Sequence, residues 1–573
     1  METKGFVYID NLPVPIQGEA NLLEMIRKAN IKLPTFCYNS ELSIFGACRM
    51  CMVEMENGSL ESACSTVPKD GMRIRTSTDR LRRYRKNILE LLLANHCRDC
   101  TTCSNNGSCK LQDLAVRYDV RTVRFDNKSP EPIVDNSSYC IVRDQSKCIR
   151  CGDCVRVCNE VQDVGAIDFM HRGASLTIST AFEDPIFDSP CVGCGQCAAV
   201  CPTGAIVVRN DAERVWKAVD DRDAYVTVQV APAVRVAIGK EYGLEDGKDV
   251  MGLIVSALRR LGFDKVYDTS TGADFTIVEE GNELRERIEK GGYDMPMFSS
   301  CCPAWVRYCE KKMPEILPYL STCRSPMQML ASMVKATDKP EGKRHVHVAV
   351  MPCTAKKFEA ARELFSVEGT PNVDYVISTQ ELILMIEEMG LVLTELDPQG
   401  VDSPFGSHTG AGVIFGASGG VTEAVLRYLS QERSVLDVTH IAYSGVRGMR
   451  GVKVATAVVN GKNVRIAVVS GLGNARTIAE RCRQGEKFDF VEVMSCPGGC
   501  VSGAGQPFGR WDNKKNRAEG LYAADRMCAH KYADQNNVVR DMYTNGILKD
   551  HAHDLLHVDY LSGYKKEKPY NER

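Results

Sequence analysis

Apolar and polar residues alternate in several short segments of the first eighty residues. Phe6–Asp10, Met52–Met55 and Met72–Thr76 alternate with the period of two that is typical of β-strands. Asn21–Ala29, between the first two, has the spacing of a short helix. The pattern predicts a small β-rich domain that ends near Ser77.

A longer helical pattern follows this domain. Over Asp79–Asn95 the apolar residues recur on one face of a helix, which leads directly into His96. A charged helical segment at Asn210–Arg222 separates the front of the chain from the rear. We place the last domain boundary there.

The rear of the chain alternates strand-like and helical segments, which is the rhythm of α/β architecture. The expected strands are Tyr225–Val230, Met295–Phe298, His345–Val350, Arg465–Ser470 and Phe488–Met494, and the expected helices are Val250–Leu261 and Phe275–Glu289.

Charge and composition exclude several classes of function. The 573 residues carry 71 basic and 74 acidic side chains, so the net charge does not indicate binding to nucleic acid or to an anionic membrane. No apolar run is long enough to span a bilayer, and Met1–Ile9 lacks the pattern of a signal peptide. We expect a cytoplasmic protein, in which 26 cysteines indicate metal rather than disulfides.

The first cysteine set is Cys37, Cys48, Cys51 and Cys64, with Gly46 and Ala47 ahead of the close pair. It resembles a plant-type 2Fe2S loop with a longer first gap. Zinc also uses cysteines two residues apart, but the loop and the domain size favour 2Fe2S.

The second set is His96, Cys100, Cys103 and Cys109. A histidine at a helix end is more often a capping or packing residue, but three cysteines within the next thirteen residues favour a 4Fe4S cluster with one imidazole ligand. Cys97 is the alternative ligand.

The third set repeats one spacing twice, which is the strongest motif in the chain. In two-cluster ferredoxins the fourth cysteine of each run ligates the other cluster. The predicted sets are therefore Cys148, Cys151, Cys154 and Cys201 for one 4Fe4S cluster, and Cys191, Cys194, Cys197 and Cys158 for the other. Zinc is a poor alternative for eight interleaved ligands.

Three cysteine motifs in the rear each follow a strand-like run. They are Ser299-Ser300-Cys301-Cys302-Pro303, Met351-Pro352-Cys353-Thr354-Ala355-Lys356 and Met494-Ser495-Cys496-Pro497-Gly498-Gly499-Cys500. Strand ends of open sheets meet at one crevice, so four of these thiolates could hold a further cluster. A fifth cysteine is left over.

At these motifs the sequence resembles the FeFe (iron-only) hydrogenases, and the resemblance covers nearly the whole chain. It implies an H-cluster, a 4Fe4S cluster joined to a two-iron subsite with CO, cyanide and azadithiolate. The implied 4Fe4S ligands are Cys302, Cys353, Cys496 and Cys500, with Cys500 bridging to the diiron subsite.

The resemblance also implies a proton path and a pocket. Cys301 matches the family's proton donor, with a path outward through Glu283, Ser321 and Glu280 to Arg287. Without the motifs, the two glutamates would read as a solvated helix face. Lys356 matches the residue that hydrogen-bonds a cyanide, and the matching pocket wall is Pro232, Met351, Phe415, Gly416 and Met494.

Some positions depart from the family pattern or have no assigned role. Ala233 stands where many relatives have a serine, and Ala504 interrupts a glycine run. The remaining cysteines are expected to be small buried hydrophobic residues: Cys140, Cys309, Cys323, Cys482 and Cys528. Gly471–Ala475 is only a fragment of a dinucleotide fingerprint, so we expect no nucleotide site.

The expected fold class is multidomain, α+β and α/β. The expected domains are a β-grasp, plant-type 2Fe2S ferredoxin at 1–78, a small helical 4Fe4S module at 79–137, a two-4Fe4S ferredoxin-like module at 138–209 and a large α/β H-cluster domain at 210–573.

The resemblance implies reversible conversion of two protons and two electrons to H2. Implied partners are ferredoxin, an NADH-linked flavoprotein with small iron-sulfur subunits, and hydrogenase maturation enzymes. Two alternatives stay open: a non-catalytic electron-transfer subunit, because the front also resembles the large iron-sulfur subunit of respiratory complex I, and an H2-sensing or scaffold protein. The rear motifs argue against the first, and Cys301 with its relay argues against the second.

Overall fold

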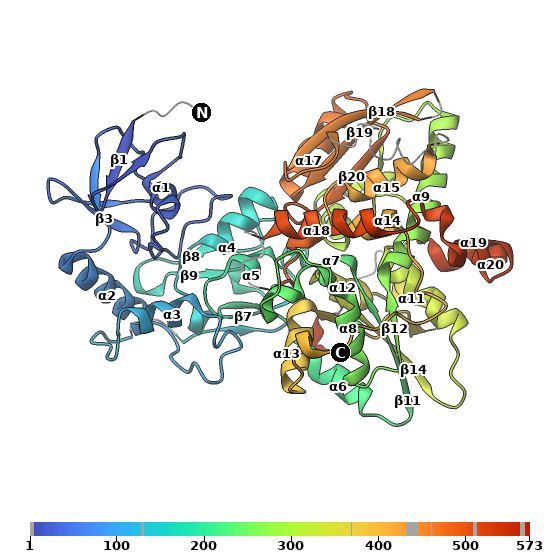
Figure 1. The fold of residues 1–573 in the computed structure, drawn as a ribbon, viewed down its shortest axis with the longest axis horizontal. Helices are drawn as coiled ribbons and strands as arrows, with labels where there is room; N and C mark the ends of the chain where they lie inside the picture. Colours follow the sequence, from blue (N-terminus) through green and yellow to red (C-terminus); the bar gives the residue numbers. More distant parts are fainter. Residues whose placement is uncertain are drawn as a thin grey trace.

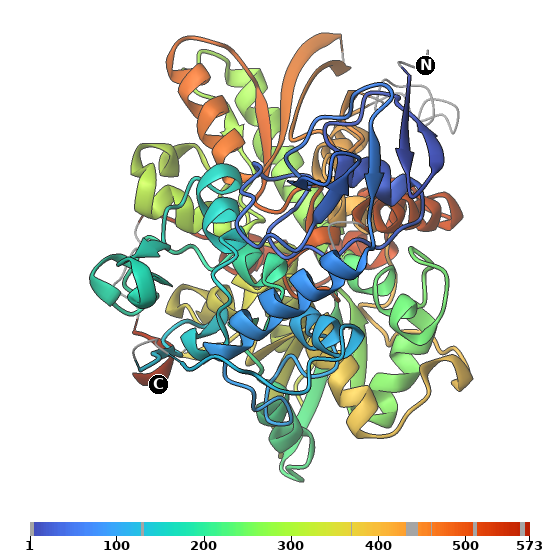
Figure 2. The same ribbon diagram turned by 90° about the vertical axis from the view of Figure 1, so that its left-hand side faces the viewer.

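The computed structural model describes residues 5–127, 131–367, 369–430, 445–459, 461–507, 513–561 and 568–572. A small β-rich N-terminal domain lies at one end of the molecule, cysteine-bearing modules lie in the middle, and a large α/β domain forms the other end (Figure 1). Seen from the N-terminal end, the blue domain lies in front of the rest (Figure 2). The predicted multidomain fold class is confirmed.

The N-terminal domain is a five-stranded mixed sheet in the order β2-β1-β5-β3-β4. One helix, α1, buries Leu22, Leu23 and Ile26 in the core of this domain, and Asn21 caps it by accepting a hydrogen bond from the Glu24 amide. The elements are β1 (Phe6–Ile9), β2 (Leu12–Pro15), α1 (Leu22–Lys28), β3 (Met52–Met55), β4 (Leu60–Ser62) and β5 (Arg73–Arg75).

A helical module joins this domain to the middle of the molecule through α2 (Asp79–Ala94) and α3 (Lys110–Arg117). Buried Arg85 of α2 donates to the carbonyls of Met50 (3.1 Å) and Met52 (2.7 Å). The helix is thereby fixed against the loop that carries the first cysteine pair.

The middle module contains a three-stranded sheet in the order β10-β7-β6 and a separate hairpin. Its two cysteine runs lead into short helices. The elements are β6 (Val134–Asp135), β7 (Ile141–Asp144), α4 (Asp153–Arg156), the π turn η2 (Val157–Val161), β8 (Asp168–Met170), β9 (Thr177–Ser179), α5 (Gln196–Val200) and β10 (Ile206–Val208).

The large domain contains two four-stranded sheets rather than one open sheet. The first, in the order β12-β11-β14-β17, is wholly parallel, and its strands are mostly buried, as expected for apolar runs covered on both faces. Its elements and nearby helices are α6 (Ala212–Val219), β11 (Ala224–Val230), α7 (Pro232–Arg235), α8 (Met251–Arg260), β12 (Lys265–Asp268), α11 (Pro326–Thr337), β14 (Arg344–Met351), α12 (Ala355–Ala360), β17 (Tyr375–Ser378) and α13 (Thr379–Glu388).

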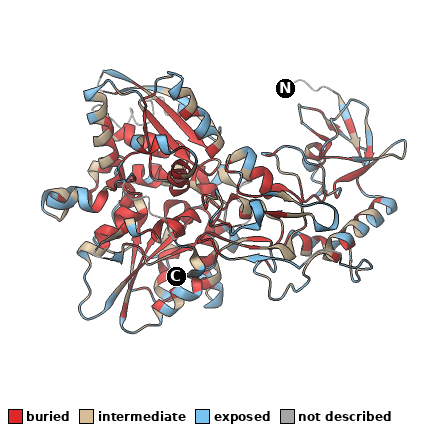
Figure 3. Cartoon of the chain, turned by 180° about the vertical axis from the view of Figure 1, so that it is seen from behind, coloured by how far each residue is buried: buried red, intermediate tan, exposed pale blue. Residues whose placement is uncertain are grey.

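The second sheet has the order β13-β20-β19-β18, with only β18 antiparallel. Figure 3 shows buried strands in the interior of the domain, whereas the edge strand β18 has several exposed residues. The elements are α9 (Thr269–Lys290), β13 (Met297–Phe298), α10 (Pro303–Lys312), α14 (Gly410–Val413), α15 (Gly420–Leu429), β18 (Val452–Val459), β19 (Lys462–Ser470), α17 (Leu472–Arg483) and β20 (Phe490–Met494).

Helix α9 begins earlier than the sequence pattern predicts. The Asp268 side chain, at the end of β12, accepts a hydrogen bond from the Ser270 amide (2.8 Å) and caps the helix directly. The first turns of α9 are buried all round, so their amphipathic signal is absent. Three further helices, α18 (Lys514–Met527), α19 (Asn537–Thr544) and α20 (Leu548–Leu556), follow in the C-terminal part.

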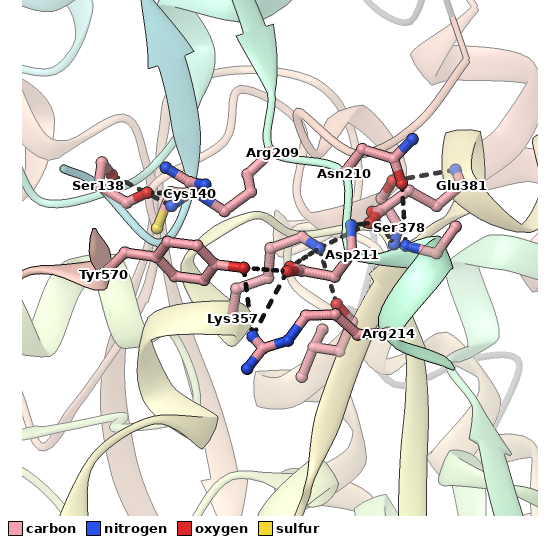
Figure 4. Close-up of polar contacts among 12 residues, drawn as sticks. Ser138, Cys140, Arg209, Asn210, Asp211, Arg214, Lys357, Ser378, Glu381 and Tyr570 are labelled. Atoms are coloured by element: carbon pink, nitrogen blue, oxygen red, sulfur yellow. Dashed lines mark hydrogen bonds and ion pairs between the residues drawn. The ribbon is translucent and has the colours of Figure 1, made fainter. Parts of the chain in front are cut away.

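A buried polar network ties the segment that follows the middle module to the rest of the large domain (Figure 4). The carboxylate of Asp211 accepts hydrogen bonds from Lys357 and from the Tyr570 hydroxyl, each at 2.8 Å. Lys357 also donates to Glu381 at 2.8 Å. Because Lys357 lies four residues after Cys353, the network positions one rear cysteine motif against the linker between the modules.

Among the described residues, no helix is long and apolar enough to cross a membrane.

Candidate active site and electron-transfer centres

The three rear cysteine motifs meet at one cavity of about 90 Å³. Cys301 and Cys302 follow β13, and Cys496 and Cys500 follow β20 of the same sheet, whereas Cys353 follows β14 of the other sheet. The predicted convergence is confirmed. The cavity lies between two sheets, however, and not at the edge of one.

The cavity is lined mainly by apolar side chains. Lys356 is the one charged residue among the described residues that line it. The five cysteines of the three motifs border the cavity, and so does Ala233. Every residue of the predicted pocket wall borders it as well: Pro232, Met351, Phe415, Gly416 and Met494.

The sequence interpretation missed several lining residues. Thr269 and Ala273 belong to the first turns of α9, where the periodicity gave no helix. Pro326 and Met327 begin α11, and Ser325 followed by proline is a recognisable helix start. Cys194 of the middle module lines the cavity as well, and nothing in the local sequence indicates this contact.

The chemistry of the donor set fits an iron-sulfur cluster. Burial raises the pKa of Cys302, raises that of Cys353 to about 11, and raises those of Cys496 and Cys500 further. The raised pKa values keep these groups as neutral thiols, so a cationic centre is needed to hold them together as thiolates. Iron is such a centre, and cysteine thiolates are its usual ligands in clusters.

The turn between Cys496 and Cys500 depends on glycine. Gly499 has φ of +98°, and a Cβ atom there would lie 2.5 Å from the Ser418 amide nitrogen. A larger residue would be strained and would also clash with backbone, so glycine is required to bring the two thiols to one wall.

Lys356 is held at the cavity wall by two contacts. Its Nζ donates to the Cys301 carbonyl (3.2 Å) and to Glu359 Oε2 (2.8 Å). Burial alone would lower the pKa of Lys356, but the Glu359 carboxylate raises it above the ordinary value. The cavity therefore contains a fixed positive charge.

The carboxylates beside Cys301 lie in the reverse of the predicted order. Burial first, and then the charge of Glu280, raise the pKa of the Cys301 thiol. Glu283 is less buried and accepts a hydrogen bond from Ser321 Oγ (2.7 Å). Burial raises the pKa of Glu283, although the Ser321 hydrogen bond and the Arg287 charge act against this. The carboxylate charge that acts on Cys301 is that of Glu280, whereas Glu283 contacts Ser321, so the prediction that Glu283 is the inner carboxylate is wrong.

Glu280 is completely buried, and neither of its carboxylate oxygens has a hydrogen-bond partner among the described residues. Burial, reinforced by the charge of Glu283, raises the pKa of Glu280 well above its ordinary value. The interpretation of these glutamates as a solvated face is therefore wrong. A buried carboxyl without a partner is costly, which points to a functional role.

The first front set lies together as predicted. Cys37 Sγ and Cys48 Sγ are 3.3 Å apart, and the Phe36 amide donates to Cys48 Sγ at 3.4 Å. Cys51 and Cys64 are buried in the same domain core. Backbone N–H groups directed at sulfur are what a cluster loop supplies.

His96 lies just past the C-terminal end of α2. It is partly exposed, and its Nδ1 atom is buried without a partner among the described residues. Burial, with the nearby Lys147 charge, lowers the pKa of His96 to about 4, which leaves the imidazole neutral. Neutral imidazole is the form that binds metal.

The interleaved sets of the middle module are also brought together. One cavity is lined by Cys148, Cys151, Cys154 and Cys201. Around the other set, burial raises the pKa of Cys194, and nearby thiolates of Cys197, Cys191 and Cys158 raise it further. In each set, therefore, the first three cysteines of one run lie near the fourth cysteine of the other run.

The remaining cysteines mostly behave as expected. Cys140, Cys309, Cys323 and Cys482 are buried, whereas Cys528 is partly exposed, so the expectation of burial is wrong for that residue.

Five family models match successive parts of the chain. "2Fe-2S iron-sulfur cluster binding domain" matches residues 6–79, "NADH-ubiquinone oxidoreductase-G iron-sulfur binding region" matches 85–124 and "4Fe-4S dicluster domain" matches 147–205. "Iron only hydrogenase large subunit, C-terminal domain" matches 224–504, and "Iron hydrogenase small subunit" matches 512–562. Fold and site thus define an iron-sulfur oxidoreductase with its own electron-transfer domains.

The chain belongs to the FeFe hydrogenase family and is a catalytic chain of that family, which interconverts H2 with protons and electrons. It is 39% identical to the NADP-reducing hydrogenase subunit HndD of Solidesulfovibrio fructosivorans, over 97% of this chain and 98% of that protein. Iron hydrogenase 1 of Clostridium pasteurianum is 36% identical over 97% and 99%. A solved FeFe-hydrogenase HydA1 variant from Chlamydomonas reinhardtii aligns with a TM-score of 0.54 and 36% identity, covering 62% of this chain and all of that one.

Proposed function

We propose that Cys302, Cys353, Cys496 and Cys500 would hold the 4Fe4S part of the H-cluster, and that Cys500 would also help to hold the diiron subsite. The observation that carries this assignment is the meeting of three distant cysteine motifs at one apolar cavity. When bound, the diiron subsite supplies the redox chemistry that joins protons and electrons into H2. The thiolates position it, and the apolar wall excludes water.

Cys301 is the proton donor and acceptor at the cavity. It lines the cavity, but it is not one of the four cysteines proposed as cluster ligands. Protons pass between Cys301 and Glu280, then by way of the Ser321 hydroxyl to Glu283, and reach solvent near Arg287. A thiol, two carboxyls with raised pKa and a hydroxyl are groups that can accept and release protons in sequence.

Lys356 provides the hydrogen bond and the positive charge that an anionic cyanide ligand needs in a buried site. Pro232, Met351, Phe415, Gly416 and Met494 form the wall around that ligand. At Gly416 a Cβ atom would lie 2.9 Å from a Leu521 methyl group and 3.3 Å from Ala233 Cβ, so a side chain there would press against the wall.

The front of the chain conducts electrons to this site. We propose a 2Fe2S cluster on Cys37, Cys48, Cys51 and Cys64, a 4Fe4S cluster on His96, Cys100, Cys103 and Cys109, and two 4Fe4S clusters on the interleaved sets of the middle module. The corresponding domains are 1–78, 79–137, 138–209 and 210–573.

Similarity to known proteins supports a proposal for the electron carrier. Because the chain is similar over its length to a subunit of an NADP-reducing hydrogenase, we propose an NAD(P)-linked flavoprotein with small iron-sulfur subunits as its partners. Ferredoxin is the second candidate, because it could dock directly at one of the front clusters.

The cluster assignment predicts the iron content. The matured chain should contain about 20 iron atoms, two of which depend on maturation enzymes. Chain made without those enzymes should hold about 18 iron atoms and labile sulfide, and should evolve no H2. Iron and sulfide analysis of anaerobically purified protein, with infrared spectra of the CO and cyanide bands, measures this. Zinc in place of iron at the front cysteine motifs would contradict the proposed electron-transfer role of the front domains.

For the second front cluster, His96→Ala should alter one 4Fe4S signal in the electron paramagnetic resonance spectrum. Electron exchange with an external carrier should slow, because the cluster loses a ligand, whereas the infrared bands should stay unchanged. Cys97→Ala is the matched control and should leave every cluster signal intact. The opposite pattern would make Cys97 the ligand.

A further inference from the structure

Three buried side chains join the middle module to the loops around the cavity. Gln162 Nε2 donates to the Ser495 carbonyl (2.9 Å), and Gln162 Oε1 accepts from Ser495 Oγ (2.9 Å). Thr354 Oγ1 donates to the Gly193 carbonyl (2.8 Å). The third side chain, that of Gln196, is different because one of its contacts ends on sulfur.

Gln196 connects two cysteine sets directly. It lies between Cys194 and Cys197, and its Nε2 donates to Cys496 Sγ at 3.1 Å and to the Ser502 carbonyl at 3.3 Å. The side chain is completely buried. Thus one residue of the loop that serves the middle cluster donates a hydrogen bond to a sulfur at the active site.

The close approach of the two loops is built into the backbone. Gly195, which precedes Gln196, has φ of +67°, and a Cβ atom there would lie 2.4 Å from Thr354 Oγ1 and 2.6 Å from Ala504 Cβ. Only glycine allows the turn to lie this close. The position of Gln196 against Cys496 is therefore fixed by packing on both sides.

A hydrogen bond to a cluster thiolate has a definite electronic effect. Each electron added to a cluster makes its sulfur ligands more negative, so an N–H donor stabilises the reduced form and raises the reduction potential. In a buried site this effect is not weakened by water.

We propose that Gln196 is a positioning residue that raises the reduction potential of the active-site 4Fe4S cluster and links that cluster to the neighbouring one on Cys191, Cys194, Cys197 and Cys158. This rests on the proposed assignment of Cys496 as a ligand. Gln196 thereby favours the arrival of electrons at the active site.

The test is Gln196→Met, which keeps the length and most of the volume of the side chain but removes the N–H donor. Infrared bands of matured protein, followed across applied potentials, give the midpoint potential. The equilibrium constant for reduction of the cluster should fall by up to about tenfold, because a hydrogen bond to a charged acceptor contributes roughly that much and is stronger in the reduced state. For one electron, tenfold is a shift of about 59 mV to lower potential.

Gln162→Met is the matched control, because it removes buried hydrogen bonds at the same interface that do not end on sulfur. Its midpoint potential should match the wild-type value. Gln196→Asn, which keeps the amide but is too short to reach Cys496, should shift the potential in the same direction as Gln196→Met. If the methionine variant does not retain its iron, the asparagine variant tests the role of Gln196 in its place.

The variant Cys496→Ala separates a failure of the ligand assignment from a failure of the proposed role of Gln196. If that variant keeps the wild-type infrared bands, the ligand assignment fails. If it loses them while both Gln196 variants keep the wild-type potential, the ligand assignment stands and the role of Gln196 is overturned. Equal shifts in the Gln162 and Gln196 variants would also overturn it, because they would indicate a general effect of loosening the interface.

Discussion

Replacing Cys301 with alanine should lower the rate of H2 turnover by about 10²- to 10⁴-fold, the contribution typical of a general acid or base. Cys301 borders the cavity, and the buried Glu280 is the carboxylate whose charge acts on its thiol. Alanine cannot accept or release a proton, so the path is interrupted at its inner end. The CO and cyanide bands should remain, because the four ligand thiolates are untouched.

Two neighbouring cysteines give the controls. Cys302→Ala should lose or damage the cluster, with a lower iron content and altered bands. Cys309→Ala, at a buried position away from the cavity, should be near normal. H2 evolution from reduced methyl viologen, measured beside infrared spectra, separates the cases. Near-normal turnover in Cys301→Ala would refute the relay, and lost bands in that variant would mean that Cys301 is a ligand.

Glu280→Gln should have an effect of similar size, about 10²- to 10⁴-fold on turnover. The amide has nearly the size of the carboxyl but cannot carry the proton. Because the Glu280 carboxyl is fully buried and unpartnered among the described residues, its removal breaks no hydrogen bond that supports the fold. The same assays apply, together with a thermal unfolding curve to show that the fold is retained.

Glu283→Gln is the informative comparison. Glu283 is partly exposed and accepts hydrogen bonds from Ser321 Oγ and the Thr322 amide. Water can replace an outer carrier more easily than an inner one, so turnover should fall less than in Glu280→Gln. A larger loss in Glu283→Gln than in Glu280→Gln would contradict the placement of Glu280 as the inner carboxyl and Glu283 as the outer one.

Much of this molecule is predictable because its chemistry is encoded over short distances along the chain. Cysteines two or three residues apart must lie near one another, so the closely spaced members of each front set follow from spacing alone. Strands such as β1, β3 and β11 follow from alternation or from continuous apolar runs. The start of helix α9 does not follow from the pattern, because its first turns are buried on all sides and show no amphipathic period.

By itself, the sequence determined the cluster-binding motifs, because they depend on residue type and local spacing, and its resemblance to a family gave the class of protein and part of the cavity wall. The tertiary structure alone decided three things: that the rear cysteines meet between two sheets, that Glu280 lies inside Glu283, and that Gln196 contacts Cys496 from 300 positions away. These depend on how helices and sheets pack in space. Packing depends on the sum of many long-range contacts, so it cannot be predicted from a local pattern of residues.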